Sequence, residues 1–376
     1  MKILYVCDAL AIYGGLERVL IEKANWLVEH GGYEVCLLTI NQGNHPFSFP
    51  LHPDVLYTDL DIRFYLQYHQ TFWKRASFFC RLHRLFREKL FGQIKEFAPD
   101  IIICTRLDYI RDVLKVKSTV PLIFESHSSR LASRFEGDGM LRRLHVWRLQ
   151  LAVKKVQMVV ALTNGDAKEW KKLTPNVCVI PNVVHLNDSG TYSDCTSKSA
   201  IFVGRFSKQK DVRSLLHIWN HVHQRHPDWC LNIYGGYGEE REVLLAEIKR
   251  MDANIQVHEP TSDIMEKYKE NSILLLTSLY EPFGLVLPEA MSCGLPVVAF
   301  DCSYGPIEVI TNNVDGFLIM DRNIESFVDN ICQLIDNVSL RQKVGKTAIA
   351  SSLRYKVDSI MSKWNNLFEK IVGFSE

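Results

Sequence analysis

Residues 272–300 read SILLLTSLYEPFGLVLPEAMSCGLPVVAF. The first apolar run, residues 273–277, does not alternate with polar residues, which is typical of a strand buried on both faces of a parallel sheet. Gly294 and Pro296 end a short helix that begins near Gly284, and residues 296–300 have the pattern of the next strand. The segment therefore predicts a strand, a glycine-containing turn, a helix and a second strand, the repeating unit of a doubly wound α/β domain.

Similar apolar runs recur along the chain and alternate with helical patterns, so the whole sequence is expected to be α/β with parallel sheets. One series of predicted strands covers residues 3–7, 34–39, 100–104, 122–125, 158–162 and 178–180. A second series covers residues 200–203, 231–234, 255–257, 273–277 and 296–300. Between the two series, residues 185–198 read HLNDSGTYSDCTSK, a polar stretch typical of a linker. We therefore predict one domain over residues 1–184, a linker over 185–198 and a second domain over 199–355.

The last segment, residues 356–376, carries one apolar stripe at helical spacing, formed by Val357, Ile360, Met361, Trp364, Leu367, Phe368 and Ile371. A helix of this kind can pack on the nearest domain. The alternative, which we expect here, is a helix that crosses back to the first domain.

Composition narrows the class of protein. The chain has 376 residues, 47% of them hydrophobic and 23% charged, as in ordinary globular proteins. Its formal net charge is +1, with 25 basic and 19 acidic residues up to residue 190 and 19 and 24 after it. Such a balance argues against a nucleic-acid partner, while the basic half is suited to an anionic ligand or surface. The 10 scattered cysteines are expected to be reduced thiols, and the apolar run at the N-terminus is too short for a signal peptide, so a cytoplasmic location is expected.

The turn after residues 273–277 is the part of the sequence that carries chemistry. It lies at the carboxyl edge of a predicted parallel sheet, where open α/β folds bind ligands. The N-terminus of the following helix is suited to a phosphate, and Glu281 and Glu289 are suited to accept hydrogen bonds from hydroxyl groups. This combination indicates a sugar joined to a nucleotide diphosphate. The alternative is that Glu281 is solvated and Glu289 is an ordinary helix residue.

The spacing Glu281-x7-Glu289 resembles the donor-binding motif of the retaining GT-B glycosyltransferases of family 4. The resemblance covers nearly the whole chain and is strongest over residues 199–320. Further matching elements follow in order, at Gly14-Gly15, Glu125-Ser126-His127, Val203-Gly204-Arg205 with Lys210, Tyr234-Gly235-Gly236 and Asp315-Gly316. Membership would imply a GT-B fold, in which two Rossmann-like domains face a cleft.

The resemblance also implies roles for individual residues. Arg205 and Lys210 would hold the donor diphosphate and stabilise the departing nucleotide diphosphate, so that no metal ion or other cofactor is needed. Glu281 would contact the sugar hydroxyls, Glu289 the ribose hydroxyls, and His127 would lie beside the donor sugar. Further donor contacts are expected from Gly14, Gly15, Gly204, Gly236, Phe283, Gly284, Leu285 and Val286.

The activity that this resemblance implies is transfer of a hexose or N-acetylhexosamine, with retention, from a nucleotide-sugar, expected to be UDP-linked, to a glycan acceptor. The acceptor is expected to be lipid-linked, as in surface polysaccharide biosynthesis. A front-face transfer is expected, because neither glutamate is an obvious nucleophile. Two alternatives stay open: a nucleotide-sugar 2-epimerase, and a membrane-associated protein that binds a nucleotide-sugar without catalysis.

Residues 72–97, FWKRASFFCRLHRLFREKLFGQIKEF, predict an amphipathic helix with seven basic and two acidic residues. Its expected apolar arc comprises Phe78, Phe79, Leu82, Leu85, Phe86, Leu90, Ile94 and Phe97, with Arg81, Arg84 and Lys95 on another arc. One interpretation is a helix that rests on an anionic membrane, which would make the protein peripheral at the inner face. The other is a core helix with a solvated basic face.

Overall fold

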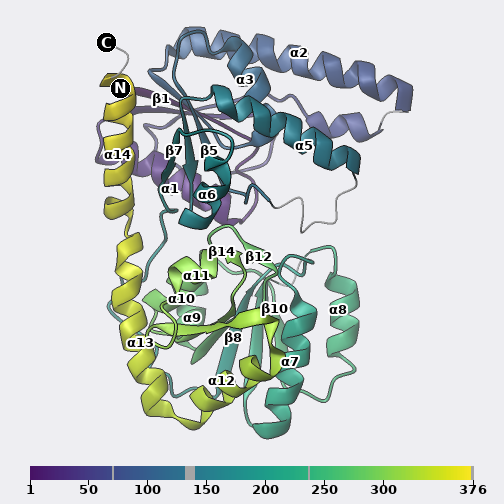
Figure 1. Cartoon of the computed structure of the whole chain (residues 1–376), viewed down its shortest axis with the longest axis vertical. Helices are drawn as coiled ribbons and strands as arrows, with labels where there is room; N and C mark the ends of the chain where they lie inside the picture. Colours follow the sequence, from purple (N-terminus) through teal and green to yellow (C-terminus); the bar gives the residue numbers. More distant parts are fainter. Residues whose placement is uncertain (70–71, 132–139, 236–237, 374–376) are drawn as a thin grey trace. The chain divides into compact units, whose positions relative to one another are not determined.

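The computed structural model describes residues 1–69, 72–131, 140–235 and 238–373, with the backbone alone at 67–69, 72–76, 141 and 142. The chain forms two compact units (Figure 1). Unit 1 comprises Met1–Arg130, Asp138–Val183 and Val357–Glu376, and unit 2 is chiefly Val184–Lys356.

Unit 1 contains a seven-stranded parallel sheet in the order β3-β2-β1-β4-β5-β6-β7. This is the Rossmann order with one more strand at the edge, and it reverses direction between β1 and β4. The strands are β1 (Lys2–Cys7), β2 (Glu34–Thr39), β3 (Leu56–Asp59), β4 (Ile101–Cys104), β5 (Leu122–Ser126), β6 (Met158–Ala161) and β7 (Val177–Val179).

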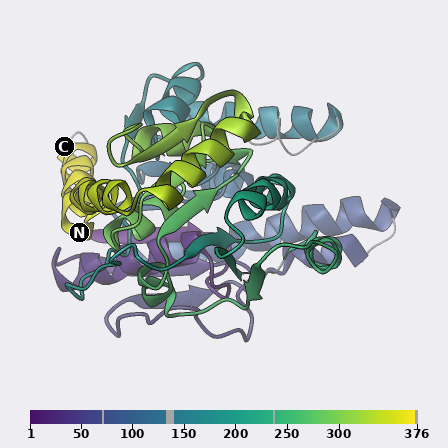
Figure 2. The same cartoon turned by 90° about the horizontal axis from the view of Figure 1, so that it is seen from below.

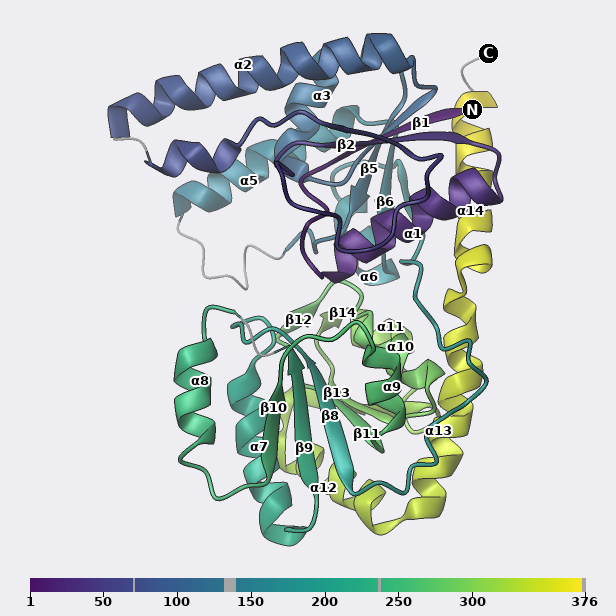
Figure 3. The same cartoon turned by 180° about the vertical axis from the view of Figure 1, so that it is seen from behind.

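Helices cover both faces of this sheet (Figure 3). They are α1 (Gly15–Glu29), α2 (Phe72–Phe97), α3 (Ile110–Val116), α5 (Met140–Ala152), α6 (Asn164–Lys171) and α14 (Val357–Gly373). Because side chains alternate along a strand, Leu4 and Val6 of β1 join the core cluster that includes α2, α3 and α6. Tyr5, on the other face of β1, lies near side chains of α1 and α14.

Unit 2 repeats the same plan with a six-stranded parallel sheet in the order β10-β9-β8-β11-β13-β15. Its strand order reverses between β8 and β11, so these two strands form the topological switch point of the unit. The strands are β8 (Ser199–Gly204), β9 (Cys230–Gly235), β10 (Ile255–His258), β11 (Ile273–Leu276), β13 (Val297–Phe300) and β15 (Gly316–Ile319); β12 (Tyr280–Glu281) and β14 (Ser303–Tyr304) form a separate pair.

The helices of unit 2 are α7 (Val212–Arg225), α8 (Arg241–Ile248), α9 (Ile264–Lys269), α10 (Val286–Ser292), α11 (Gly305–Val309), α12 (Ile324–Asp336) and α13 (Val338–Ser352). One core cluster joins α7 and α12 to β8, β9, β11 and β13. The GT-B type of fold, with two Rossmann-like parallel-sheet domains, is thus confirmed.

The strand predictions are confirmed wherever the chain is apolar and buried on both faces. Four strands escaped prediction: β3, β12, β14 and β15. β3 is an edge strand with polar positions, and β12 and β14 have two residues each, so neither type carries the buried apolar run used for prediction. β15 is short and directly follows a polar turn at residues 311–315.

The segment predicted to be a linker, residues 185–198, packs along unit 2. The backbone N–H of Asn187 donates to the Ser292 hydroxyl oxygen at 3.0 Å, and the N–H of Ser193 donates to the Cys293 carbonyl at 2.8 Å. The C-terminal helix α14 belongs to unit 1 by its contacts. The Trp26 indole N–H on α1 donates to the Asp358 carboxylate on α14 at 2.8 Å.

Helix α2 departs from the arc expected for it. Leu82, Phe86, Leu90, Ile94 and Phe97 are buried, whereas Phe79 is 39% and Leu85 37% exposed. Leu85 lies at one edge of the expected arc. Phe79 lies in the middle of the arc but precedes Leu82, the first buried residue of the stripe, so its exposure comes from its place along the helix and not from its face. Among the described residues, no helix is long and apolar enough to span a bilayer.

Candidate active site

The loops that follow β8 and β11 meet at the switch point of unit 2. Lys210 comes from the loop after β8, and Glu281 comes from β12, just after β11. The Lys210 ammonium lies 2.5 Å from Oε1 of Glu281, and the side chains are 15% and 6% exposed. Because the carboxyl ends of adjacent parallel strands share one sheet edge, two residues far apart in sequence form this ion pair.

Three hydrogen-bond donors fix the two loops against each other. The Leu279 N–H donates to the Gln209 carbonyl at 2.8 Å, and the Gln209 amide donates to the Tyr280 carbonyl at 3.1 Å. The Thr277 hydroxyl is within reach of two carbonyls, those of Lys210 at 3.0 Å and Asp211 at 3.1 Å. The backbone on both sides of the ion pair is therefore held in place without a ligand.

Glu281 is oriented by its own surroundings as well as by Lys210. The Ser278 hydroxyl donates to Oε1 of Glu281 at 2.7 Å, and β12 pairs with β14 so that Glu281 lies opposite Tyr304. Gly305 permits this packing, since a Cβ there would lie 2.3 Å from the Phe283 carbonyl oxygen. The carboxylate is thus preorganised at the sheet edge.

Arg322 is a second cation that contacts the loops after β8 and β11. Its guanidinium pairs with the Asp211 carboxylate and donates to the carbonyls of Ser278 at 3.0 Å and Thr277 at 3.1 Å. Asp211, in the left-handed conformation at φ 46°, caps α7 through the Ser214 N–H and hydroxyl. Arg322 therefore holds the end of β11 to the start of α7.

Arg205 presents a cation to solvent beside the pair. The residue is exposed, and its guanidinium makes no hydrogen bond or ion pair among the described residues. Ser207, two residues on, has a buried hydroxyl that likewise finds no partner in the described part of the chain. Gly204 precedes them at the end of β8, where a Cβ would lie 3.5 Å from the Lys210 side chain.

The turn before α10 adopts the shape that the sequence predicts, with a later helix start. Gly284 has φ +83°, which favours glycine, and α10 begins at Val286. The backbone N–H groups of Leu285 and Val286 find no backbone acceptor among the described residues. Phe283, predicted to contact the donor, is 3% exposed, and its ring packs edge to face on that of Tyr355 at 5.2 Å, so the structure places it in the interior of unit 2. Gly236, also predicted to bind the donor, lies outside the described residues.

Glu289 lies inside α10 and is 8% exposed. Its Oε2 accepts a hydrogen bond from the Tyr268 hydroxyl of α9 at 3.2 Å. Both glutamates of the predicted motif thus belong to one loop-and-helix segment, and each carboxylate has a defined partner.

In unit 1, the Gly14-Gly15 turn after β1 leads into α1. The predicted role of this turn is close approach to a donor phosphate, but the carboxylate of Glu17 folds back over Gly14. A Cβ on Gly14 would lie 2.3 Å from Oε2 of Glu17. A phosphate at this helix N-terminus would therefore have to displace a negative charge that the chain itself places there.

His127 follows β5 and lies beside a buried ion pair. Lys23 of α1 and Glu125 of β5 are 2.6 Å apart, with side chains 1% and 2% exposed. Nε2 of His127 lies 3.2 Å from the same carboxylate oxygen, Oε1 of Glu125. Burial acts to raise the pKa of Glu125, but the positive charge of Lys23 and the charge interaction with His127 lower it to about 2.

Family models match both halves of the chain. Residues 13–188 match the model described as Glycosyltransferase Family 4, and residues 191–351 match the one described as Glycosyl transferases group 1. The chain belongs to the GT-B glycosyltransferases. This confirms the family that the motifs around Glu281 and Lys210 indicate, and it makes the protein a transferase of glycosyl groups.

Individual relatives agree with this family. This chain is 29% identical over 385 residues to the amylovoran biosynthesis glycosyltransferase AmsD of Erwinia amylovora. The match covers 97% of this chain and 99% of AmsD. The chain is also 29% identical to an uncharacterized glycosyltransferase of Haemophilus influenzae, covering 94% and 96% of the two chains. Among solved structures, a complex of S. aureus TarM with UDP has a TM-score of 0.80 at 15% identity, covering 98% and 99%. Anabaena HepE with UDP and glucose has a TM-score of 0.76 at 17% identity, with the same coverage.

Several residues of the glycosyltransferase site were not predicted from the sequence. Lys23 carried a usable signal, because it lies within the apolar stripe of α1 formed by Val19, Leu20, Ala24 and Leu27. Arg322 and Tyr268 carried none, since their partners come from distant segments. The described residues include no group of three His, Cys, Asp or Glu side chains arranged to hold a metal ion.

Proposed function

We propose that this glycosyltransferase moves a hexose or N-acetylhexosamine, with retention of configuration, from a UDP-sugar to a glycan acceptor in surface polysaccharide biosynthesis. The observation that carries the proposal is the meeting of Lys210, Glu281 and the unpaired Arg205 at one sheet edge. The printed functions of relatives support the pathway class, since AmsD acts in amylovoran biosynthesis. UDP in the TarM and HepE complexes supports the choice of nucleotide.

The donor diphosphate would bind to Arg205 and Lys210. Arg205 has no partner to give up within the described residues, and Lys210 can keep one contact with Glu281 while its remaining N–H groups bind phosphate oxygens. Two cations of this kind would stabilise the charge that grows on the leaving diphosphate, the task that a metal ion performs elsewhere. Glu281, held by Ser278, would accept hydrogen bonds from the sugar hydroxyls, and Glu289 from the ribose.

We infer a front-face transfer. The bond between the anomeric carbon and the diphosphate oxygen breaks, and the acceptor oxygen bonds to the same face of that carbon. The acceptor proton passes to the departing phosphate oxygen, so no covalent enzyme intermediate is formed. His127 would lie beside the donor sugar, as the family resemblance implies.

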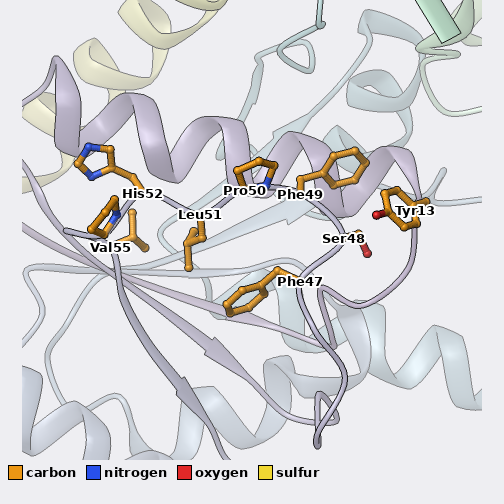
Figure 4. A pocket seen from close by; sticks show the side chains of 9 residues that line it. Tyr13, Phe47, Ser48, Phe49, Pro50, Leu51, His52 and Val55 are labelled. Carbon is orange, nitrogen blue, oxygen red and sulfur yellow. The ribbon is translucent and has the colours of Figure 1, made fainter. Parts of the chain in front are cut away.

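The acceptor surface that we propose is a pocket of about 640 Å³ in unit 1. Figure 4 shows Tyr13 and Phe49 side by side at one end and His52 and Val55 at the other. Tyr13 is 64% exposed and packs edge to face on Phe49 at 5.5 Å. Aromatic side chains suit the apolar faces of sugar rings, and polar groups such as those of Ser48 and His52 suit their hydroxyl groups.

A lipid-linked acceptor would bring the enzyme to a membrane. Helices α2 and α5 project from the same side of unit 1 (Figures 1 and 2). Exposed apolar side chains lie on both, including Phe91 at 53% and Trp147 at 49%. Arg81, Arg84 and Arg143 are exposed on the same helices. Apolar and basic groups together suit an anionic bilayer surface, and we propose peripheral association there.

The deciding experiment offers a panel of UDP- and GDP-sugars, with and without a lipid-linked glycan acceptor, and measures nucleotide release and product. We expect UDP release that depends on acceptor, a product with the donor's anomeric configuration by NMR, and full activity in EDTA. UDP release without acceptor together with an epimerised sugar would identify an epimerase. Binding without turnover would identify a non-catalytic protein, and an inverted product would exclude front-face transfer.

A further inference from the structure

The buried Lys23–Glu125 pair under His127 has no part in binding the donor as proposed above. It lies in the interior of unit 1, where α1, β1, β5 and α14 meet. The Lys23 ammonium lies 3.7 Å from the ring centre of Trp364 on α14 and 5.4 Å from that of Tyr5 on β1. An ion pair so deeply buried is expensive to desolvate and is seldom an efficient way to gain stability.

Unsatisfied polar atoms mark this cluster. Oε2 of Glu125, Nε2 of His127 and the Tyr5 hydroxyl are all buried and lack a hydrogen-bond partner among the described residues. Nε2 is nevertheless 3.2 Å from Oε1 of Glu125, so a small rotation of the imidazole ring would complete the bond. Such long or misaligned contacts are common in catalytic sites without substrate and tighten when it binds.

We propose that Glu125, held by Lys23, is the positioning residue of His127, fixing the orientation and protonation of its ring for glycosyl transfer. Carboxylates that accept a hydrogen bond from one ring nitrogen set which nitrogen carries the proton, leaving Nδ1 for another partner. This inference rests on the proposed function, because it assumes that His127 acts on the donor sugar.

Lys23 sets the strength of this effect. Glu125 has one negative charge, and Lys23 and the His127 ring both lie against the same carboxylate oxygen, so the two compete for it. The groups that act on this cluster electrostatically are Lys23 from α1, Tyr5 from β1, and Glu125 and His127 from β5 and its end. Burial lowers the pKa of Lys23, and the charge of Glu125 opposes that shift.

Replacing Glu125 and replacing Lys23 should therefore shift the pKa of His127 in opposite directions. In Glu125→Gln the ring loses its carboxylate, and its pKa should fall. In Lys23→Met the carboxylate has His127 as its remaining partner, and the imidazole pKa should rise. We expect each shift to be about one unit or more. A purely structural role would not move this pKa in opposite directions.

The experiment is an NMR titration of histidine ring protons in the full chain, with the His127 signal identified by its absence in His127→Asn. The double variant Lys23→Met/Glu125→Gln, which leaves neither charge unpaired, serves if a single variant does not fold. Its His127 pKa should fall by less than in Glu125→Gln, because the Lys23 charge is also removed. Lys168→Met, an exposed lysine on α6, is the control for loss of charge. An unchanged His127 pKa in the folded variants would overturn the proposal.

Kinetics provide the second readout. Glu125→Gln should lower kcat about 10- to 100-fold with little change in the donor KM, as for other residues that orient a functional histidine. Full transfer by His127→Ala would remove the catalytic part of this inference together with the role of His127 in the proposed function. If His127 is required but Glu125→Gln keeps wild-type kcat, the positioning role alone fails.

Discussion

Two lysine–glutamate pairs, one in each unit, differ in surroundings far more than in geometry. Lys23–Glu125 in unit 1 is 2.6 Å apart and Lys210–Glu281 in unit 2 is 2.5 Å apart. The first is sealed in the core with side chains 1% and 2% exposed, whereas the lysine of the second is 15% exposed on a loop at the sheet edge. The first pair has aromatic faces around its cation, and the second has an open arginine beside it.

Burial therefore assigns different tasks to the same two residue types. A charge sealed in a core can act only on its immediate neighbours, which for Glu125 are Lys23 and His127. A charge at the carboxyl edge of a parallel sheet can be exchanged between the protein and an incoming anion. Breaking the pair in unit 1 should thus chiefly lower stability, because it leaves a buried charge unpaired, and breaking the pair in unit 2 should chiefly lower turnover.

The largest effect is expected from removing the buried cation. Lys23→Met leaves Glu125 charged in the core, which should lower the free energy of unfolding by about 3–5 kcal/mol. Hydrogen exchange in peptides from α1 and β5 locates the loss within unit 1. The double variant Lys23→Met/Glu125→Gln should recover much of it. If Lys23→Met is as stable as the control variant Lys168→Met, the unpaired Glu125 carboxylate does not destabilise the fold and this prediction is wrong.

Lys210→Met should show the reverse behaviour. We expect kcat/KM for transfer to fall by about 10²–10³, the usual cost of losing one donor to a developing anion. Stability should change by about 2 kcal/mol or less, because Lys210 reaches solvent and Ser278 still donates to Glu281. Steady-state UDP release and urea unfolding measure the two quantities. Equal losses of stability in the Lys23 and Lys210 variants would erase the contrast between the units.

Acid should weaken unit 1 through Glu125. Its pKa is about 2 in the folded protein against a usual value of 4.5, so the folded state binds fewer protons than the unfolded state between these values. Stability from this group is complete above pH 4.5 and is lost as pH falls toward 2, by about 2–3 kcal/mol. Urea unfolding at pH 6 and pH 3 measures it. The double variant Lys23→Met/Glu125→Gln should lack this part of the acid dependence; an identical dependence would contradict the assignment.

The sequence predicts the features that depend on local pattern. Strands such as β11 and β13 are recognisable because both faces are buried and every residue is apolar. Lys210 and Glu281 are found from the motifs around them. The two-residue strand β12, which orients Glu281, has no periodicity to detect.

The local sequence pattern does not show which residues from distant segments form pairs in the fold. Lys210 and Glu281 are 71 positions apart, and Lys23 and Glu125 are 102 apart. The first pairing follows only once the strand order places β8 beside β11. The carboxylate of Glu17 over Gly14 was equally invisible, because a glycine pair before a helix is compatible with either a phosphate or a side chain.

A third ion pair lies on the surface, and its loss should have the smallest effect on stability of the three. Arg84 and Glu88 of α2 are 2.8 Å apart with side chains 78% and 58% exposed. Solvent screens such a pair, so Arg81→Glu/Arg84→Glu should leave urea unfolding unchanged within error.

If α2 contacts an anionic bilayer, the Arg81→Glu/Arg84→Glu variant should bind less to vesicles containing phosphatidylglycerol in a flotation assay, by roughly fivefold for each basic charge removed. Lys249→Glu/Arg250→Glu, an exposed basic pair in unit 2, is the matched control and should float like the wild type. Equal flotation of all three proteins would leave α2 as a core helix with a solvated basic face.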